Sequence, residues 1–209
     1  MNTDRQIEWT IDRKPFSWVS SRIAGFLLWC IGWHVEGPVP QGQRFVAIAA
    51  PHRSGLDLIV ALLTAIKIRI PIVFMMKKSM FWWPLSLLWH RLGGLPIDRS
   101  QRKQIVPNMV EAMKRAKHMA LVITPEGTRK NVQRWKTGFY WIAWGARVPV
   151  LLLWIGHENK AAGLGEFMDL TGDIQADFAR IRAWYEAKLG RPMPQITPGD
   201  QIAPPEGVQ

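Results

Sequence analysis

The feature of this chain that most constrains its fold is an apolar run that stops at a proline and resumes after a Ser-Gly pair. The first run covers residues 45–50 and the second covers residues 58–63. A short apolar run that ends at Pro is typical of a buried strand, and an apolar run that follows turn-forming residues is typical of a helix. The pattern therefore predicts a strand, a tight turn and a helix.

The same alternation continues along most of the chain. We expect an α/β fold with a mixed or mostly parallel central sheet flanked by helices, preceded by an N-terminal apolar helix at the membrane interface. Ligands of open α/β sheets bind at the carboxyl ends of the strands. The predicted strands are residues 44–50, 70–74, 95–97, 119–124 and 148–155, and the predicted helices lie near residues 56–66, 80–91, 103–117, 139–145 and 174–189.

Length and composition indicate one folded domain with two flanking segments. The 209 residues suffice for a single domain with a sizeable core. We expect an apolar, interfacial segment at residues 1–43 and the α/β domain at residues 44–189. Residues 190–209 are rich in Pro and Gly and are expected to form a mostly disordered tail.

A candidate catalytic pair lies in the turn between the first predicted strand and helix, where His52 precedes Asp57 by five positions. A turn that leads into the first helical turn can fold the imidazole back onto the carboxylate. The carboxylate would then orient the histidine as a general base for a hydroxyl. Alternatively, Ser54 and Asp57 form a helix cap and His52 is an ordinary loop histidine. These residues alone leave both interpretations open.

Four segments in order resemble motifs of the glycerolipid acyltransferase family, whose best-known members acylate 1-acylglycerol 3-phosphate. The resemblance spans about residues 44–156, and the ordered set is more specific than any one motif. The family also has segments similar to residues 77–84 and 136–139. The four motifs are His52-Arg53-Ser54-Gly55-Leu56-Asp57, Gly93-Gly94-Leu95-Pro96-Ile97-Asp98-Arg99, Pro125-Glu126-Gly127-Thr128-Arg129 and Val148-Pro149-Val150.

The resemblance implies an enzyme that moves a fatty acyl chain from acyl-CoA or acyl-carrier protein to 1-acylglycerol 3-phosphate, giving phosphatidate. His52 would be the base and Asp57 would fix its tautomer, so no covalent acyl-enzyme is needed. We expect no cofactor beyond the acyl donor. We also expect no metal site, because the other four histidines show no ligand spacing.

The resemblance also implies substrate-binding roles. Arg99 is expected to bind the acceptor phosphate, because its planar guanidinium can make two parallel hydrogen bonds. Glu126 and Gly127 would bind the glycerol part of the acceptor. Three further residues complete the predicted site: Thr128 as a hydroxyl contact or a helix cap, Arg129 as a second phosphate contact, and Lys77 as a phosphate-steering residue or a headgroup anchor.

Composition favours a membrane-surface protein. The chain holds 12 Trp, and residues 51–150 hold 17 of its 27 Lys and Arg but 4 of its 16 Asp and Glu. Indoles prefer the headgroup layer, and such a basic region attracts anionic lipids and phosphorylated substrates. Trp82, Trp83 and Trp89 lie near basic residues and are candidates for interfacial contact, whereas Trp141, Trp144 and Trp154 are expected to fill the core.

The longest stretch without Asp, Glu, Lys or Arg is residues 23–35, and these 13 residues are shorter than the roughly 20 that span a bilayer. This stretch suits a buried helix or one lying in the interface, and Trp29 and Trp33 favour the interface. Acidic residues before it argue against a signal peptide. We therefore expect a peripheral protein at the cytoplasmic face of the cell membrane.

Other functions remain open at this stage. The same chemistry on another lysolipid, an amino-acid lipid or a glycolipid is one alternative. A basic, Trp-rich protein that binds anionic membrane without catalysis is another, although it would not need ordered polar motifs at strand ends. The expected partners are the acyl donor, possibly acyl-carrier protein, the lysophospholipid and an anionic membrane surface. No nucleic-acid partner is expected, because no nucleic-acid-binding motif is recognisable.

Overall fold

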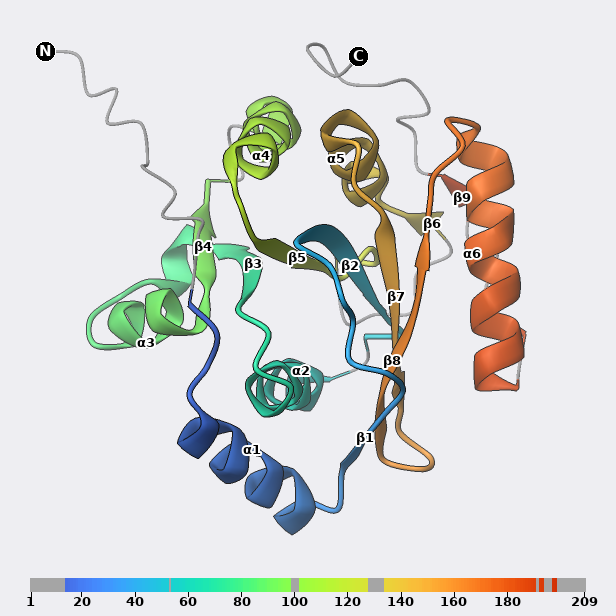
Figure 1. Ribbon diagram of the computed structural model, residues 1–209. Helices are drawn as coiled ribbons and strands as arrows, with labels where there is room; N and C mark the ends of the chain where they lie inside the picture. The colour runs from blue at the N-terminus through green and yellow to red at the C-terminus, as the bar shows by residue number, and fades with distance from the viewer. Residues whose placement is uncertain are drawn as a thin grey trace, which may run out of the picture.

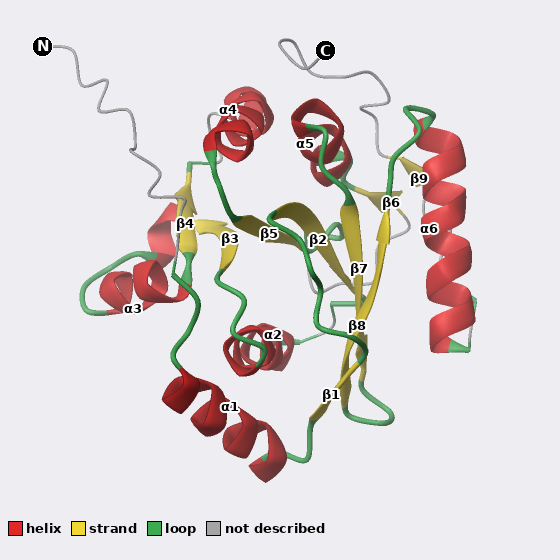
Figure 2. Cartoon of the chain, viewed as in Figure 1, coloured by secondary structure: helices red, strands yellow, loops and turns green. Residues whose placement is uncertain are grey.

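A seven-stranded sheet lies at the centre of the protein in the computed structural model (Figure 1; Figure 2), which describes residues 14–52, 54–98, 102–127, 134–190, 192–193 and 197–198. The strand order is β1-β8-β7-β2-β5-β3-β4. The strands are β1 (His34–Glu36), β2 (Arg44–Ala50), β3 (Ile72–Lys77), β4 (Gly94–Ile97), β5 (Met119–Ile123), β7 (Val150–Gly156) and β8 (Ala161–Met168). A separate pair consists of β6 (Arg134–Trp135) and β9 (Thr197–Pro198).

The sheet is mostly parallel, because β7, β2, β5, β3 and β4 pair side by side in one direction. At the β7 end, β8 runs antiparallel to β7 and β1 pairs parallel to β8. All residues of β2 after Arg44 are buried. A strand covered on both faces has this unbroken apolar character, which is why its sequence does not alternate.

Helices cover both faces of the sheet. They are α1 (Trp18–Cys30), α2 (Gly55–Lys67), α3 (Leu85–Leu92), α4 (Arg102–Arg115), α5 (Gly138–Ala146) and α6 (Ile174–Leu189), with a 3₁₀ turn at Lys78–Met80. One face packs against α4, α5 and α6 in a large core that includes Met109, Phe139 and Phe178. The other face packs against α2, with α1 lying outside α2 (Figure 1).

This arrangement confirms the predicted α/β class with a mostly parallel sheet flanked by helices. The strands β1 and β8 were not predicted, so the sheet already begins within the segment expected to precede the domain. The third helix begins at Leu85 rather than near residue 80. Pro84 explains the shift, since proline is tolerated at a helix start but not in its interior.

The helix α1 overlaps the apolar stretch at residues 23–35 but begins five residues before it, and its place at a membrane interface stays a prediction. α1 begins after Ser17, whose hydroxyl accepts from the Ser20 N–H, and ends at Cys30. The Ser21 hydroxyl donates to the Lys67 carbonyl at 2.6 Å, which ties α1 to the end of α2. Ala24 and Leu28 face inward while most apolar neighbours on the helix are exposed. None of the helices in the described part of the chain has the length and apolar character needed to cross a membrane.

Three tryptophan predictions concerning the fold are corrected by the structure. Trp33, expected at the interface, is only 5% exposed and packs with Leu28 of α1. Trp144, expected in the core, is 38% exposed on α5, and Trp89 is half-buried with its indole nitrogen enclosed. Most of the predicted disordered tail lies outside the described residues.

Candidate active site

The candidate site forms where three adjacent parallel strands end. In the order β7-β2-β5, His157 follows β7 directly, Pro51-His52 follows β2, and Thr124-Pro125-Glu126 follows β5. Because the strands are parallel and in close register, their carboxyl ends meet at one edge of the sheet. Three segments that are distant in sequence therefore place polar side chains together.

His52 and Asp57 lie next to each other, as the sequence analysis predicted. His52 Nδ1 is 3.2 Å from Asp57 Oδ2, with the Asp57 side chain fully buried and the His52 side chain 17% exposed. Nε2 lies on the side of the ring away from Asp57. A carboxylate at Nδ1 favours the tautomer in which Nε2 can accept a proton.

The alternative interpretation, a helix cap, is also present. The Asp57 Oδ2 atom accepts from the Ser54 backbone N–H at 2.8 Å, and Oδ1 accepts from the Ser54 hydroxyl at 3.0 Å. This is the arrangement of a capping box at the start of α2. One buried carboxylate therefore closes the helix start and faces the imidazole, so the two interpretations do not exclude each other.

Glu126 holds the backbone of the histidine. Its Oε2 atom accepts from the His52 backbone N–H at 2.8 Å, a contact that joins the end of β5 to the end of β2. The buried hydroxyl of Tyr185 on α6 donates to the carbonyls of Ile48 on β2 and Leu153 on β7. Burial raises the pKa of Tyr185 well above its ordinary value, and the charge of Glu126 raises it further. Tyr185 thus stays a neutral donor beneath the site.

Gly127 turns the chain after Glu126 with φ at +62°. A Cβ at this position would lie 2.6 Å from Lys136 Nζ, so the lysine side chain passes directly over the glycine. The exposed ammonium of Lys136 therefore sits at the turn that carries Glu126. The sequence analysis had not assigned a role to this lysine, although it lies in a segment similar to the family.

The remaining predicted site residues fall into two groups. Lys77 is the last residue of β3, is exposed, and pairs in register with Ile97 of β4. It therefore lies at the same edge of the sheet as His52, two strands away in the order β2-β5-β3. The predictions for Arg99, Thr128 and Arg129 concern residues outside the described part of the chain, and they stay predictions.

An apolar cavity lies beneath α2, close to the histidine and aspartate. Small side chains on β2 leave space between the strand and the helix, because alanine fills little volume. Ala49 is three residues before His52, and Val60 is one turn after Asp57 on α2. The cavity is lined by Ala47, Ala49, Val60, Thr64, Leu153 and Ile155, among other mostly apolar residues.

His157 is the residue of this site that the sequence analysis missed. Its Nε2 atom lies 3.2 Å from Asp57 Oδ1, and its side chain is 26% exposed. The available signal was its position two residues after a predicted strand, the same position that His52 and Glu126 have after theirs. In the sequence, His157 was considered only as a metal ligand, and a histidine that contacts a carboxylate need not show metal-ligand spacing.

Comparison with known proteins identifies the family. The family model described as Acyltransferase matches residues 31–156, which is more than half of the chain and contains His52, Asp57 and Glu126 but neither His157 nor Tyr185. The chain therefore belongs to the acyltransferase family, which confirms the resemblance predicted from its motifs.

Two relatives illustrate the match. The chain is 29% identical over 133 residues to a protein from Cocos nucifera named 1-acyl-sn-glycerol-3-phosphate acyltransferase, covering 60% of this chain and 42% of that protein. It thus spans less than half the length of the coconut protein. Its fold matches the crystal structure of the 1-acyl-sn-glycerophosphate acyltransferase PlsC from Thermotoga maritima with a TM-score of 0.56, at 18% identity over 82% of this chain and 75% of that one.

The contact between Glu126 and the His52 backbone yields a testable prediction. Glu126→Ala should lower kcat for acyl transfer by about 10- to 100-fold, the range for loss of an outer partner of an active-site residue. Glu126→Gln keeps a carbonyl acceptor at the same reach and should retain more of kcat. Steady-state kinetics of both variants measure this, with Glu111→Ala on the exposed face of α4 as the control. Equal activity of Glu126→Ala and wild type would contradict the role.

Proposed function

We propose that this protein is an O-acyltransferase that moves a fatty acyl chain from acyl-CoA or acyl-carrier protein to the free hydroxyl of 1-acylglycerol 3-phosphate. The observation that carries the proposal is the 3.2 Å contact between His52 and the buried Asp57 at the carboxyl edge of the sheet. Membership of the acyltransferase family and the names of the two relatives support it.

The residues account for the chemistry as follows. His52 Nε2 takes the proton from the acceptor hydroxyl, whose oxygen attacks the thioester carbonyl. The carbon–sulfur bond then breaks, and the leaving thiolate receives the proton from the imidazolium. Asp57 stabilises the imidazolium while it exists and keeps Nδ1 protonated. The new ester is phosphatidate when the acceptor is 1-acylglycerol 3-phosphate.

The proposed substrate positions follow from the groups that lie at the carboxyl edge of the sheet. The cavity beneath α2 is mostly apolar and begins about one helical turn from the catalytic pair, and its volume of about 60 Å³ would accept only a few carbons of a fatty acyl chain. The cations of Lys77 and Lys136 lie at the same edge and can attract a phosphate. Arg99, two residues beyond β4, is assigned to the phosphate itself, with Thr128 and Arg129 as further acceptor contacts.

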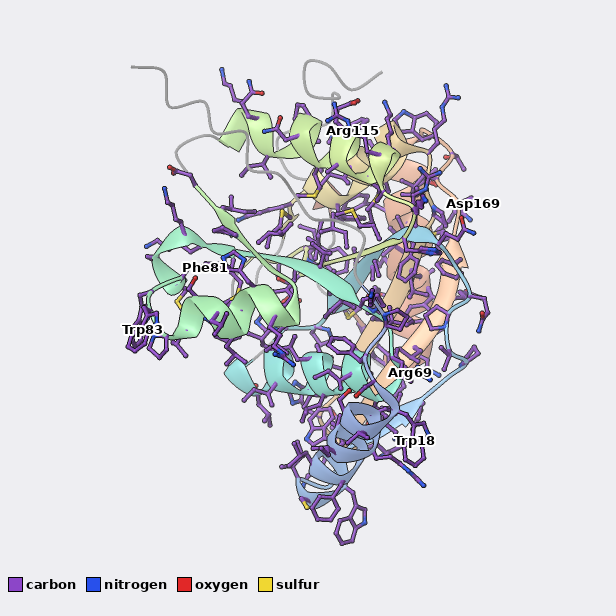
Figure 3. The ribbon with its side chains drawn as sticks, turned by 60° about the vertical axis from the view of Figure 1, so that its left-hand side comes forward. Trp18, Arg69, Phe81, Trp83, Arg115 and Asp169 are labelled. Carbon is purple, nitrogen blue, oxygen red and sulfur yellow. The ribbon has the colours of Figure 1, made fainter. Side chains whose placement is uncertain are left out.

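We further propose that the protein works at the cytoplasmic face of an anionic membrane, attached through α1 and through residues 80–88, which lead into the first half of α3. We call the exposed side chains of these two segments the apolar surface. Figure 3 shows Trp18 at the start of α1 and Trp83 before α3. Basic residues including Arg22, Lys77 and Lys78 are exposed beside this surface. Its members are Trp18, Val19, Ile23, Phe26, Leu27, Trp29, Met80, Trp82, Trp83, Leu87 and Leu88.

The catalytic pair is tested by removing each member. His52→Ala should lower kcat/KM by about 10²- to 10⁴-fold, the contribution of a general base. Asp57→Asn should be strongly impaired as well, because an amide can present an N–H to the imidazole in place of an acceptor. The measurement is thiol release from labelled acyl-CoA with lysophosphatidate, and His34→Ala, an exposed histidine, is the control. A fully active His52→Ala would refute the proposed mechanism.

The acceptor is tested with a panel of lysolipids. If Arg99 grips a phosphate monoester, lysophosphatidate should be preferred over lysophosphatidylcholine, whose phosphodiester carries less charge and a bulky substituent. Arg99→Ala should lower kcat/KM for lysophosphatidate by about 10- to 100-fold, as expected for charged hydrogen bonds, and Arg99→Lys should restore part of it.

Arg115→Ala, on the opposite side of the sheet from α2, controls for the loss of one positive charge. A wild-type enzyme that ignores lysophosphatidate and acylates an amino-acid lipid or a glycolipid would leave the catalytic pair intact and overturn the substrate assignment.

Membrane attachment is tested by liposome sedimentation. Trp29 and Trp83 are 73% and 85% exposed, so replacing both with Ala should weaken binding on the order of tenfold per indole without lowering the melting temperature. Trp144→Ala removes a partly exposed indole from α5 and is the matched control. Salt should weaken binding to anionic vesicles without abolishing it. Unchanged binding of the double variant would contradict the proposed surface.

A further inference from the structure

The carboxylate of Asp57 lies between two histidines from different elements. His52 Nδ1 faces Oδ2, and His157 Nε2 faces Oδ1, each at 3.2 Å. His52 belongs to the turn before α2, whereas His157 is the first residue after β7. A simple His-Asp pair needs only the contact with His52, so the contact of Asp57 with His157 requires a separate explanation.

The surroundings of Asp57 give that reason. Its side chain is 0% exposed, and a buried carboxylate is stable only when donors compensate both oxygens. Ser54 donates to both oxygens, but it belongs to the same helix start as Asp57 and moves with it. His157 contacts Oδ1 from the sheet. A hydrogen bond at this contact would resist rotation of the carboxylate, and the orientation of the carboxylate determines where Oδ2 meets His52.

The position of the His157 ring is itself supported. The buried indole of Trp33 packs edge-to-face with the imidazole, with ring centroids 5.7 Å apart and an angle of 88° between the planes. Trp33 in turn packs with Val60 of α2 and Ile155 of β7. The imidazole is therefore enclosed on one side by a rigid aromatic group and faces Asp57 with Nε2.

The separation of Nε2 and Oδ1 is short enough for an ion pair, but the ring nitrogen is not aligned for a linear hydrogen bond. Hydrogen bonds in catalytic sites often become short and linear only when substrate is bound. Metal binding is a poor explanation for the cluster, because no group of three or more His, Cys, Asp and Glu side chains in the described ranges is arranged to hold an ion.

We propose that His157 is a positioning residue for the acyl transfer assigned above: through Nε2 it holds the Asp57 carboxylate so that Oδ2 stays on His52 Nδ1. His157 does not touch substrate in this role, and it acts through Asp57 and His52. The inference rests on the proposed function and adds a third residue to its catalytic pair.

The test uses three substitutions of His157. Leu removes the N–H, Gln places an amide nitrogen at about the reach of Nε2, and Asn is one carbon shorter and places it at about the reach of Nδ1. Leu and Asn should lower kcat by about 10- to 100-fold, the range for loss of an outer partner of an active-site group. Gln should recover most of kcat. KM for acyl-CoA and for the lysolipid should stay within about twofold, because His157 contacts neither substrate.

A double-substitution cycle tests whether His157 acts through the base. Adding His157→Leu to His52→Ala should cost little more than His52→Ala alone, because the orientation of Asp57 no longer matters once the base is gone. Melting temperatures of all variants distinguish positioning from a merely structural role. In a structural role, the Leu, Asn and Gln variants would lose stability and activity in parallel.

The outcomes separate the two proposals. A wild type without acyl transfer, or a fully active His52→Ala, overturns the proposed function. If wild type is active and His52→Ala is not, three results overturn the role of His157 alone: an active Leu variant, a Gln variant as impaired as Leu, or an effect confined to KM. A kcat loss in Leu and Asn, rescue by Gln and non-additivity with His52→Ala support it.

Discussion

The buried carboxylate of Asp57 is the interaction on which the candidate site depends. It caps the first turn of α2 through its hydrogen bonds with Ser54. It also faces His52, which follows β2, and contacts His157, which follows β7. Desolvating a carboxylate costs several kcal/mol unless its donors are retained. The same carboxylate therefore contributes to the free energy of folding and to the geometry of the proposed base. A substitution at Asp57 would alter both.

Much of the fold followed from local patterns. The α/β class, the position of β2 and the start of α2 were predictable because apolar runs broken by Pro51 and Ser54-Gly55 determine strand and helix boundaries locally. The strand β8 was not predicted, because its sequence Ala161–Met168 contains two glycines and lacks a strong apolar run. It is stabilised by pairing with β7, and such long-range pairing is not visible in a local pattern.

The candidate site, like the fold, has contacts that a local pattern predicts and long-range contacts that it does not. The proximity of His52 and Asp57 was predictable because only four residues separate them in the chain. The contact of Glu126 with the His52 backbone spans 74 positions, so the motifs indicated that Glu126 matters but not which atom it would meet. His157 belongs to none of the recognised motifs, and its contact with Asp57 depends on the order β7-β2, which the sequence alone does not reveal.

Trp33 connects two parts of the protein that would otherwise be treated separately. It follows α1, the helix proposed to rest on the membrane, and its indole packs against the imidazole of His157. The helix proposed as the membrane anchor and the candidate catalytic site thus both contact the indole of Trp33. A truncated protein lacking the first 36 residues would lose both the proposed attachment helix and the packing of Trp33 on His157, so low turnover by such a fragment would not measure how much the enzyme needs a lipid surface. Substitutions of outward-facing indoles leave the packing of Trp33 on His157 in place and are the cleaner way to separate attachment from turnover.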